Sequence, residues 1–242
     1  MVLTNQTPQK EVADLFDRIS GKYDTMNNVI TLGMHQRWRE ETMAILRVQP
    51  GDQVLDLCCG TGDWTIELAQ AVGPSGHVYG LDFSPDMLKV AQQKVQQAGL
   101  SERITLLEGD AMQLPFDDEL FNFVTIGFGL RNVPDAGRVL SEMTRVCQPG
   151  GAVACLETSQ PEGPVLHKMW SAYFKAVPVL AKVFVDHYQD YDYLQKTSKN
   201  FLTARQLLHL FNEVGLQPAS YKMFLFGAAA LHLGFRKPTV TR

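Results

Sequence analysis

One short segment holds the acidic residues and glycines that are best suited to bind a ligand, and one further acidic residue follows it. Segment 56–63 reads Asp-Leu-Cys-Cys-Gly-Thr-Gly-Asp, and Asp82 follows Gly62 by twenty positions. Two closely spaced glycines let the backbone approach a ligand, and the helix expected after them offers free N–H groups. A carboxylate at this distance from a glycine loop reaches ribose hydroxyls. The spacing therefore predicts a site for a ligand that contains a nucleoside.

The loop differs from those that bind dinucleotides or triphosphates. A dinucleotide fingerprint, G-x-G-x-x-G, has its third glycine where this chain has Thr65, and Asp63 would repel a diphosphate. No G-x-x-x-x-G-K-[ST] loop occurs in the chain. Asp56 and Asp63 instead favour a ligand with an ammonium or sulfonium cation. We therefore expect an adenosine-bearing cation as the ligand, and Thr65 and Asp63 argue against a nicotinamide oxidoreductase.

Strand and helix patterns alternate around this loop, which is typical of a doubly wound parallel sheet. Ligands of such sheets bind beyond the carboxyl ends of the strands. The glycine loop, Asp82, Asp110 and the pair Arg131-Asn132 all follow predicted strands and should meet at that edge. The strands are expected at about 53–58, 77–83, 104–108, 121–128 and 152–157, and helices at about 64–72, 84–98, 134–146 and 203–214.

Two further regions flank the alternating part. Residues 1–10 are expected to be disordered or weakly held, and helices are predicted at 11–19 and 35–46 from their apolar spacing. Residues 164–193 are rich in aromatic side chains and break the alternation. This insertion is interpreted either as core packing or as a helical lid over an apolar substrate, and the two interpretations are compatible.

Composition excludes several classes of function. The chain of 242 residues is 45% hydrophobic and has a net charge of −4, so no basic surface points to a nucleic-acid partner. Its four cysteines form neither a disulfide framework nor a set of zinc ligands, and no metal site is expected. The polar first ten residues lack the apolar core of a signal peptide, and no run of eighteen apolar residues occurs. We therefore expect a cytoplasmic protein.

Two additional motifs resemble a known family. Segments 56–63 and 80–84 look like the first two motifs of class I S-adenosylmethionine-dependent methyltransferases. Lys-Tyr-Asp-Thr-Met-Asn at 22–27 and Gly-Phe-Gly-Leu-Arg-Asn-Val at 127–133 resemble the signatures of the ubiquinone/menaquinone C-methyltransferase family. Residues 155–161 are similar to the bacterial members that act on demethylmenaquinone alone.

The resemblance implies an α/β fold of the Rossmann-like class I methyltransferase type, with a seven-stranded, mostly parallel sheet. An antiparallel hairpin at about 217–224 and 229–236 would complete this sheet. The whole chain, 1–242, would form one methyltransferase domain. Its parts would be an N-terminal helical cap (11–49), a cofactor-binding core (50–160), a helical lid insertion (161–202), and a C-terminal helix and hairpin (203–237).

The resemblance also implies S-adenosylmethionine as the cofactor and assigns residues to its parts. The methionine part would lie against Asp56 and the backbone of Gly60, Thr61 and Gly62. Asp82 would bind the ribose, and Asp110 and Ala111 the adenine edge. Many relatives carry Asn at position 110, and both side chains offer an acceptor for the adenine amino group. Asp110 is also compatible with a simple turn after a strand.

The implied reaction transfers a methyl group from S-adenosylmethionine to a ring carbon of demethylmenaquinol, giving menaquinol. A phenol titrates at about pH 10, so the reaction needs a base and a stabilised phenolate. Arg131 is assigned to phenolate stabilisation and Asn132 to orientation, whereas Arg131 as a surface residue paired with an acid is the alternative. Tyr23, Asp24, His35 or a water stay open as the proton relay.

Other acceptors and partners stay open as well. A C-methyltransferase of the ubiquinone pathway or of another small apolar acceptor is the alternative within enzymes, and a non-catalytic binding subunit is the alternative outside them. The prenylated substrate implies transient contact with a membrane surface and a place at the inner face of the membrane. Lys168, Lys175 and Lys182 are candidates for headgroup contact, or simply a solvated face. A homodimer is compatible with the sequence, which leaves the oligomeric state open.

Overall fold

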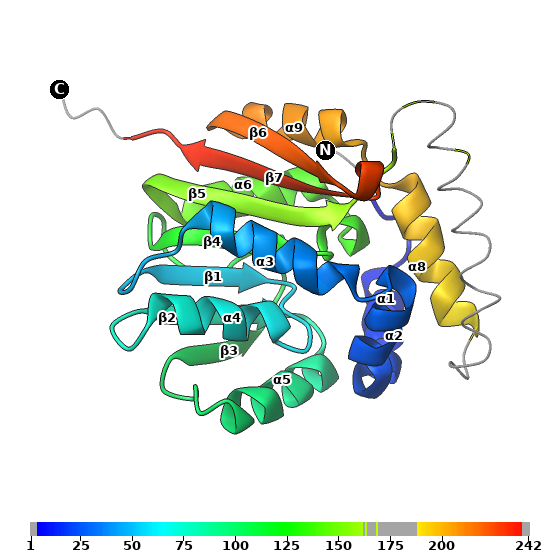
Figure 1. The fold of residues 1–242 in the computed structure, drawn as a ribbon, viewed down its shortest axis with the longest axis horizontal. Helices are drawn as coiled ribbons and strands as arrows, with labels where there is room; N and C mark the ends of the chain where they lie inside the picture. The colour runs from blue at the N-terminus through cyan, green and yellow to red at the C-terminus, as the bar shows by residue number, and fades with distance from the viewer. Residues whose placement is uncertain (1–3, 162, 164–167, 169–187, 239–242) are drawn as a thin grey trace.

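A seven-stranded sheet forms the centre of the protein (Figure 1). The computed structural model describes residues 4–161, 163, 168 and 188–238. The strand order is β3-β2-β1-β4-β5-β7-β6, and β7 runs antiparallel to both of its neighbours while the other pairs are parallel. The predicted fold class is thus confirmed. The strands are β1 Gln53–Leu57, β2 His77–Asp82, β3 Ile104–Glu108, β4 Phe121–Gly127, β5 Cys147–Thr158, β6 Leu216–Phe224 and β7 Ala229–Arg236.

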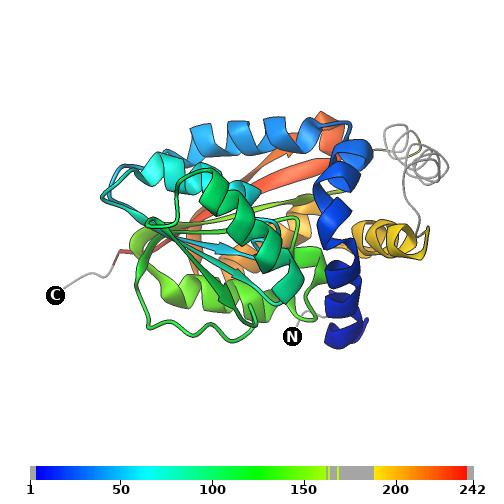
Figure 2. The same ribbon diagram turned by 90° about the horizontal axis from the view of Figure 1, so that it is seen from below.

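Helices cover both faces of the sheet (Figure 2). α3, α4 and α5 pack on one face, and α6 and α9 pack on the other. The helices are α1 Gln9–Ile19, α2 Tyr23–Thr31, α3 Met34–Leu46, α4 Asp63–Val72, α5 Pro85–Gln97, α6 Ala136–Val146, α8 Tyr188–Asn200 and α9 Ala204–Glu213, with short 3-10 turns η1 Ser20–Lys22, η2 Leu130–Asn132 and η3 Leu225–Gly227. In the part of the chain that is described, no helix is both long and apolar enough to span a membrane.

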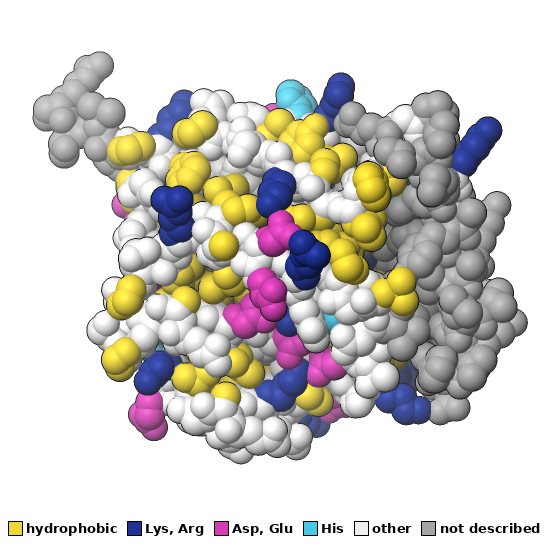
Figure 3. Space-filling view, viewed as in Figure 1, with side chains coloured by type: hydrophobic (Ala, Val, Ile, Leu, Met, Phe, Trp, Pro, Cys, Tyr) yellow, Lys and Arg dark blue, Asp and Glu magenta, His cyan; other side chains and the backbone are white. Residues whose placement is uncertain are grey.

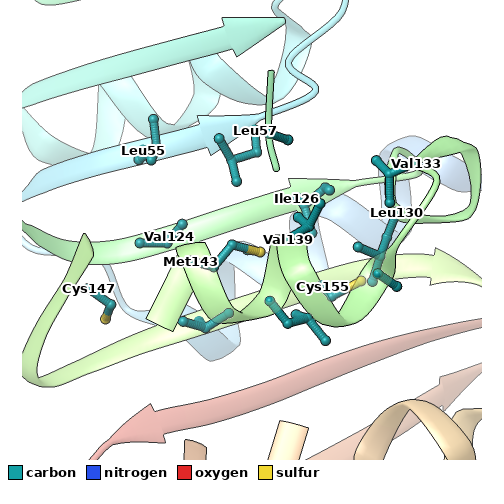
Figure 4. Packing of buried hydrophobic residues seen from close by; sticks show 14 of the residues in the cluster. Leu55, Leu57, Val124, Ile126, Leu130, Val133, Val139, Met143, Cys147 and Cys155 are labelled. Atoms are coloured by element: carbon teal, nitrogen blue, oxygen red, sulfur yellow. The ribbon is translucent and has the colours of Figure 1, made fainter. Parts of the chain in front are cut away.

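The alternation of side chains along β1 divides the core in two. Val54 packs under α4, whereas Leu55 and Leu57 face α6 on the other side of the sheet. All three side chains are fully buried. Figure 4 shows the second cluster, in which Leu57, Ile126 and Leu130 gather near the carboxyl ends of β1 and β4. This packing holds the ends of the strands, and the loops that follow them, in fixed positions.

Local capping explains why several helices begin where the sequence predicts. The Ser84 hydroxyl accepts a hydrogen bond from Met87 N and caps α5, while Pro85 occupies its first position. Asp135 caps α6, and Thr203 forms a capping box at α9.

Strand β5 differs from its predicted start, because Cys147 already pairs with Phe121 ahead of a register shift.

The N-terminal region lies across the carboxyl edge of the sheet, where α1, α2 and α8 meet (Figure 1). Phe16, Met26, Met87 and Leu194 belong to one apolar cluster that joins these helices to α5. Helix α2 was not predicted, since four of its residues, Asp24, Thr25, Asn27 and Asn28, have low helix propensity. Most of the 161–202 insertion, including Lys175 and Lys182, lies outside the described residues. The lid therefore stays a proposal.

The prediction that residues 1–10 are weakly held is wrong for residues 4–10. Thr4 N donates to Pro134 O at 3.0 Å, and the Thr4 hydroxyl donates to Val133 O at 2.7 Å. Asn5 is buried, and α1 already begins at Gln9. Partners more than a hundred residues away hold this segment, and no local pattern signals them.

Candidate active site

Two adjoining cavities open at the carboxyl ends of the parallel strands. They enclose about 680 and about 500 Å3, including space open to solvent. Five residues line both cavities, so we describe them as the larger half and the polar half of one cleft. The shared residues are Tyr23, Cys58, Gly60, Gly127 and Phe128.

Asp82 anchors the larger half at the end of β2. Its side chain is 5% exposed and accepts hydrogen bonds from Gly60 N at 2.8 Å and Ser84 N at 2.9 Å. Burial raises the pKa of this carboxyl to about 6, while the backbone N–H groups oppose that rise. Asp82 therefore ties the glycine loop to the next strand and presents an anionic edge to the cleft at neutral pH.

Asp110 and Ala111 close the far end of the larger half, after β3. Asp110 Oδ1 accepts a hydrogen bond from Met112 N at 2.8 Å, which is the geometry of a turn. The turn and the binding interpretations of this residue are therefore compatible. Among the described residues, the larger half is lined by Asp82 and Asp110 and by no Lys or Arg. Such a lining suits a cationic ligand.

The glycine loop brings the backbone close to the cleft and to helix α5. Gly60 and Gly62 have φ values of +54° and +81°, which favour glycine. A β-carbon on Gly62 would lie 3.0 Å from Ala91 Cβ. Gly60 lines both halves, whereas Gly62 lines neither. Gly62 thus serves the turn and the close approach of α5, and its contact with the cofactor stays a prediction.

Asp56 lies at the base of the polar half. It is 1% exposed and accepts hydrogen bonds from Thr65 Oγ1 at 2.7 Å and Thr125 Oγ1 at 2.9 Å. Burial raises its pKa to about 6, against the lowering effect of the two threonines. Asp56 therefore links β1, α4 and β4 directly beneath the loop.

The charge argument for Asp63 is wrong, because its carboxylate already has cationic partners. Lys94 from α5 forms an ion pair with Asp63, and Arg39 Nη1 lies 3.5 Å from Asp63 Oδ2. Lys94 also contacts Asp24 Oδ2 at 2.6 Å, and Thr61 donates to Asp24 Oδ1 at 2.6 Å. Asp63 is therefore largely neutralised, and Asp24 joins the cap to the glycine loop instead of facing the larger half.

Arg131 is paired, but its partner is buried and not on the surface. Its Nη1 donates to Glu157 Oε1 at 2.6 Å and to Phe128 O at 2.5 Å, and the side chains of the pair are 8% and 1% exposed. The backbone N of Arg131 donates to Glu157 Oε2 at 3.2 Å. Arg131 Nε is buried and has no partner. The residue lies behind the lining of the larger half, which Asn132 joins directly.

Three buried polar atoms near this pair lack hydrogen-bond partners. They belong to Arg131 Nε, Asn132 Oδ1 and Ser159 Oγ, and all three residues are at most 8% exposed. Buried polar groups are normally satisfied, so such a concentration calls for an explanation. Because Asn132 lines the cleft, a ligand hydroxyl is a suitable donor to its Oδ1.

Two tyrosines flank the Arg131–Asn132 turn. Burial raises the pKa of Tyr23, while the Asn27 side chain and the Arg131 charge oppose the rise. Tyr23 is therefore a neutral phenol at physiological pH. Tyr193 from α8 accepts a hydrogen bond from Asn5 Nδ2 at 2.8 Å, and Asn5 Nδ2 also donates to Asn132 O at 2.9 Å. Asn5, Tyr193 and Lys94 were not identified from the sequence, since isolated residues of these types carry no motif. Glu157 and Ser159 lie in the segment 155–161 that resembles relatives, but no role was predicted for either residue.

The other titratable candidates are poorly suited to act as a base. His35 lines the polar half but is 5% exposed and is hydrogen-bonded to Thr31 through Nδ1 at 2.7 Å. Burial lowers its pKa. Burial also raises the pKa of Cys58 and Cys59 well above the usual thiol range, so both are neutral. Among the described residues, no cluster of three His, Cys, Asp or Glu forms a metal site.

Solved structures with the same fold support the architecture. A SAM-dependent methyltransferase from Aquifex aeolicus aligns with a TM-score of 0.59 at 18% identity, covering 81% of this chain and 87% of that one. A putative S-adenosyl-L-methionine-dependent methyltransferase from Methanococcus maripaludis aligns at 0.66 and 17%, covering 93% and 95%. At these identities the similarity establishes the fold.

Sequence comparison identifies much closer relatives. A curated Bacillus cytotoxicus protein named demethylmenaquinone methyltransferase is 50% identical over 96% of this chain and 98% of its own length. A Lactiplantibacillus plantarum protein of the same name is 50% identical over 93% and 96%. The model of one methyltransferase family matches residues 3–236, which is almost the entire chain. The chain therefore belongs to the ubiE/COQ5 methyltransferase family.

Proposed function

We propose that this methyltransferase transfers a methyl group from S-adenosylmethionine to a ring carbon of demethylmenaquinol, giving menaquinol. The observation that carries the proposal is the 50% identity, over nearly full length, to proteins named demethylmenaquinone methyltransferase. A C-methyltransferase of the ubiquinone pathway, or of another small apolar acceptor, is the competing function.

The cleft fits S-adenosylmethionine in shape and charge. We assign the adenosine to the larger half, with Asp82 at the ribose and Asp110 and Ala111 at the adenine. The methionine part is assigned to the polar half, along Gly60 and Thr61 with Asp56 beneath them. Gly60, Gly127 and Phe128 line both halves of the cleft and so lie where the two halves join. When bound, S-adenosylmethionine supplies an electrophilic methyl group on a sulfonium ion.

The acceptor ring is assigned to the part of the larger half beside Asn132 and Tyr23. Asn132 Oδ1, buried and without a partner, is placed to accept a hydrogen bond from a ring hydroxyl and so to orient the ring. The neutral Tyr23 phenol can donate to a ring oxygen as it gains negative charge. In this arrangement the hydroxyl that donates to Asn132 keeps its proton, and the other ring hydroxyl loses its proton to water or to a relay. The Tyr23 hydroxyl then donates to the resulting phenolate oxygen.

Arg131 is assigned an electrostatic role behind this wall. Glu157 offsets much of its charge, so Arg131 acts on an anionic ring oxygen through its remaining positive charge and not by direct contact. Asp24 was an alternative relay. Because Lys94 and Thr61 occupy both of its oxygens, we assign Asp24 to closing the cap over the methionine part and favour Tyr23 beside the ring.

A prenylated quinol resides in lipid, so we infer that the protein contacts a membrane surface transiently while it works. This inference includes a position at the inner face of the membrane. A homodimer is compatible with the proposed reaction and is not required by it, since both halves of the cleft come from one chain.

A radiolabelled methyl-transfer assay tests the proposal. Purified protein receives labelled S-adenosylmethionine with either reduced demethylmenaquinol or a reduced demethylated ubiquinol precursor. Label only in menaquinol supports the proposed function, and label in the ubiquinol product favours the competing one. Cofactor binding by calorimetry without label in either product would contradict both quinol reactions and favour another acceptor or a non-catalytic subunit. An Asp82→Ala variant, which should bind cofactor poorly, serves as the negative control.

A further inference from the structure

Three large apolar side chains are exposed at one edge of the protein. Leu32 is 73% exposed, Leu225 49% and Phe226 77%. Leu32 lies between α2 and α3, and the other two lie in η3, at the tip of the β6–β7 hairpin. Folding buries such side chains where it can, so their exposure needs a cause outside the core.

The pairing of the strands places η3 on the same edge as the cleft. Thr158, the last residue of β5, pairs with Ala229, and Ala229 also pairs with Phe224. The turn between Phe224 and Ala229 therefore extends beyond the carboxyl end of β5. Figure 1 shows η3 at this end of the sheet, near the N-terminus of α3.

Contacts between α3 and β6 bring Leu32 to the same region. Lys222 contacts Glu41 at 2.8 Å, and two residues later Phe224 stacks on Trp38 with ring centroids 6.3 Å apart. The two elements thus run in opposite directions. Beyond this contact, β6 continues toward Phe226, and α3 followed backwards along the chain continues toward Leu32. Both residues therefore lie on the same side of the contact between Phe224 and Trp38. Figure 3 shows apolar side chains gathered toward this end of the face.

The backbone at these residues is unfavourable as well. Leu32, Leu225 and Phe226 have φ values of +51°, +42° and +54°, a conformation that side chains with a β-carbon rarely adopt. Two other apolar residues with positive φ, Cys58 and Phe128, line the cleft. Strained residues of this kind concentrate at functional sites. The three exposed residues thus combine two unfavourable features that packing among the described residues does not offset.

We propose that Leu32, Leu225 and Phe226 form a docking surface for a lipid bilayer. The proposal rests on the proposed function, in which the acceptor is a prenylated quinol. The residues lie on the tips of two turns, a shape that suits insertion among headgroups. Apolar contact also continues inward, because Phe224 stacks on Trp38 and Trp38 lies 6.2 Å from Phe128 in the cleft wall. Docking here would present the cleft to the layer that holds the acceptor.

Substitution with asparagine tests the docking surface while preserving the fold, because asparagine tolerates a positive φ better than leucine or phenylalanine. The variant Leu32→Asn/Leu225→Asn/Phe226→Asn is compared with wild type by flotation with phosphatidylcholine vesicles. We expect wild type to float, at high salt as well, and the variant to partition roughly 30-fold or more less strongly. Leu120→Asn is the matched control, since Leu120 is 45% exposed directly before β4, at the opposite edge. It should float like wild type.

Several outcomes would overturn the proposal: wild type that does not float, a triple variant that floats equally well, or binding that high salt abolishes. If the same substitutions instead abolish a concentration-dependent dimer in light scattering without vesicles, the surface binds a second copy of the chain. The proposed function is tested separately with a short-chain, water-soluble quinol, which the triple variant should methylate at the wild-type rate. Flotation through this surface without methylation of any quinol would uphold docking and refute the proposed function.

Discussion

The two sides of the cleft differ in how their polar groups are satisfied. On the cofactor side, the carboxylates of Asp56 and Asp82 each accept two hydrogen bonds, from strand β4, helix α4 and the loops after β1 and β2. On the acceptor side, buried atoms of Arg131, Asn132 and Ser159 have no partner. One side is a completed network, and the other has hydrogen-bonding capacity left for a ligand.

This contrast follows from how the two sides are built. The cofactor side uses strand ends and the loops that directly follow them, so its geometry is set by the sheet. The acceptor side joins η2 to the N-terminal segment and α8 through Asn5, whose amide reaches Asn132 and Tyr193. The comparison predicts that substitutions on the acceptor side affect turnover more than cofactor affinity, and those on the cofactor side the reverse.

Removing the anion behind the acceptor side should have the largest effect. Glu157→Gln leaves the buried Arg131 charge without its carboxylate, which should lower the free energy of unfolding by about 3 kcal/mol or more. Turnover should fall by roughly 100-fold, because Glu157 holds both the backbone and the side chain of Arg131. Urea unfolding and steady-state kinetics measure both. Glu142→Gln is the matched control, because Glu142 pairs with the more exposed Arg145, neither residue lines the cleft, and turnover should stay unchanged.

Asn132→Ala should separate the two sides of the cleft. Loss of the Oδ1 acceptor should reduce kcat/KM for the quinol by roughly 10- to 100-fold while the Kd for S-adenosylmethionine stays at the wild-type value. Asp82→Ala should produce the opposite pattern, with cofactor affinity reduced by roughly 10-fold or more. Calorimetry and initial rates distinguish the two. Equal losses of cofactor affinity in both variants would contradict the division of the cleft.

The completed network on the cofactor side should make stability depend on pH. Burial raises the pKa of Asp56 from 3.8 to about 6, so the folded protein holds this proton more tightly than the unfolded chain. The contribution of this proton to the stability of the folded protein is fully present below about pH 4, and it is lost as the pH rises through 6. At pH 8 the free energy of unfolding of Asp56→Asn should therefore be about 2 kcal/mol higher than that of wild type. At pH 4 this gain in stability should disappear. A gain that is constant with pH would show that the Asp56 charge is not responsible.

The smallest effect is expected at Asn5. Asn5→Ala removes donors to Asn132 O and Tyr193 Oη without touching the cleft lining. The KM for the quinol should rise roughly threefold to tenfold, whereas cofactor affinity stays constant. Asn212→Ala is the control, because its amide also donates to a backbone carbonyl, at Leu208, within α9. If Asn5→Ala behaves like this control, the N-terminal segment has no part in positioning the acceptor.

Much of the fold was predictable because its signals are local. Strand β3, Ile104–Glu108, occurs at its predicted position, and the caps Ser84 and Asp135 start helices as expected. The family resemblance placed the two hairpin strands to within one residue. Helix α2 and the early start of β5 were missed, since tertiary contacts override weak local patterns there.

The site was predictable only in part. Asp82, Asp110 and Asn132 do line one half of the cleft, as their positions after strands indicate. Asp63 was misjudged because its partner Lys94 lies 31 residues away in α5. A carboxylate that appears free in the sequence can thus be neutralised by a residue that no motif marks.

The sequence by itself determined the strand-loop-helix order, the glycine turn and the edge at which ligands bind, because these depend on neighbouring residues and on the periodicity of apolar side chains. Only the tertiary structure decided which charges remain unpaired and which buried atoms lack partners. Arg131 meets Glu157 across 26 residues, and Asn5 meets Tyr193 across 188. Such pairs form when packing brings distant segments together, and their energies depend on the burial that packing creates.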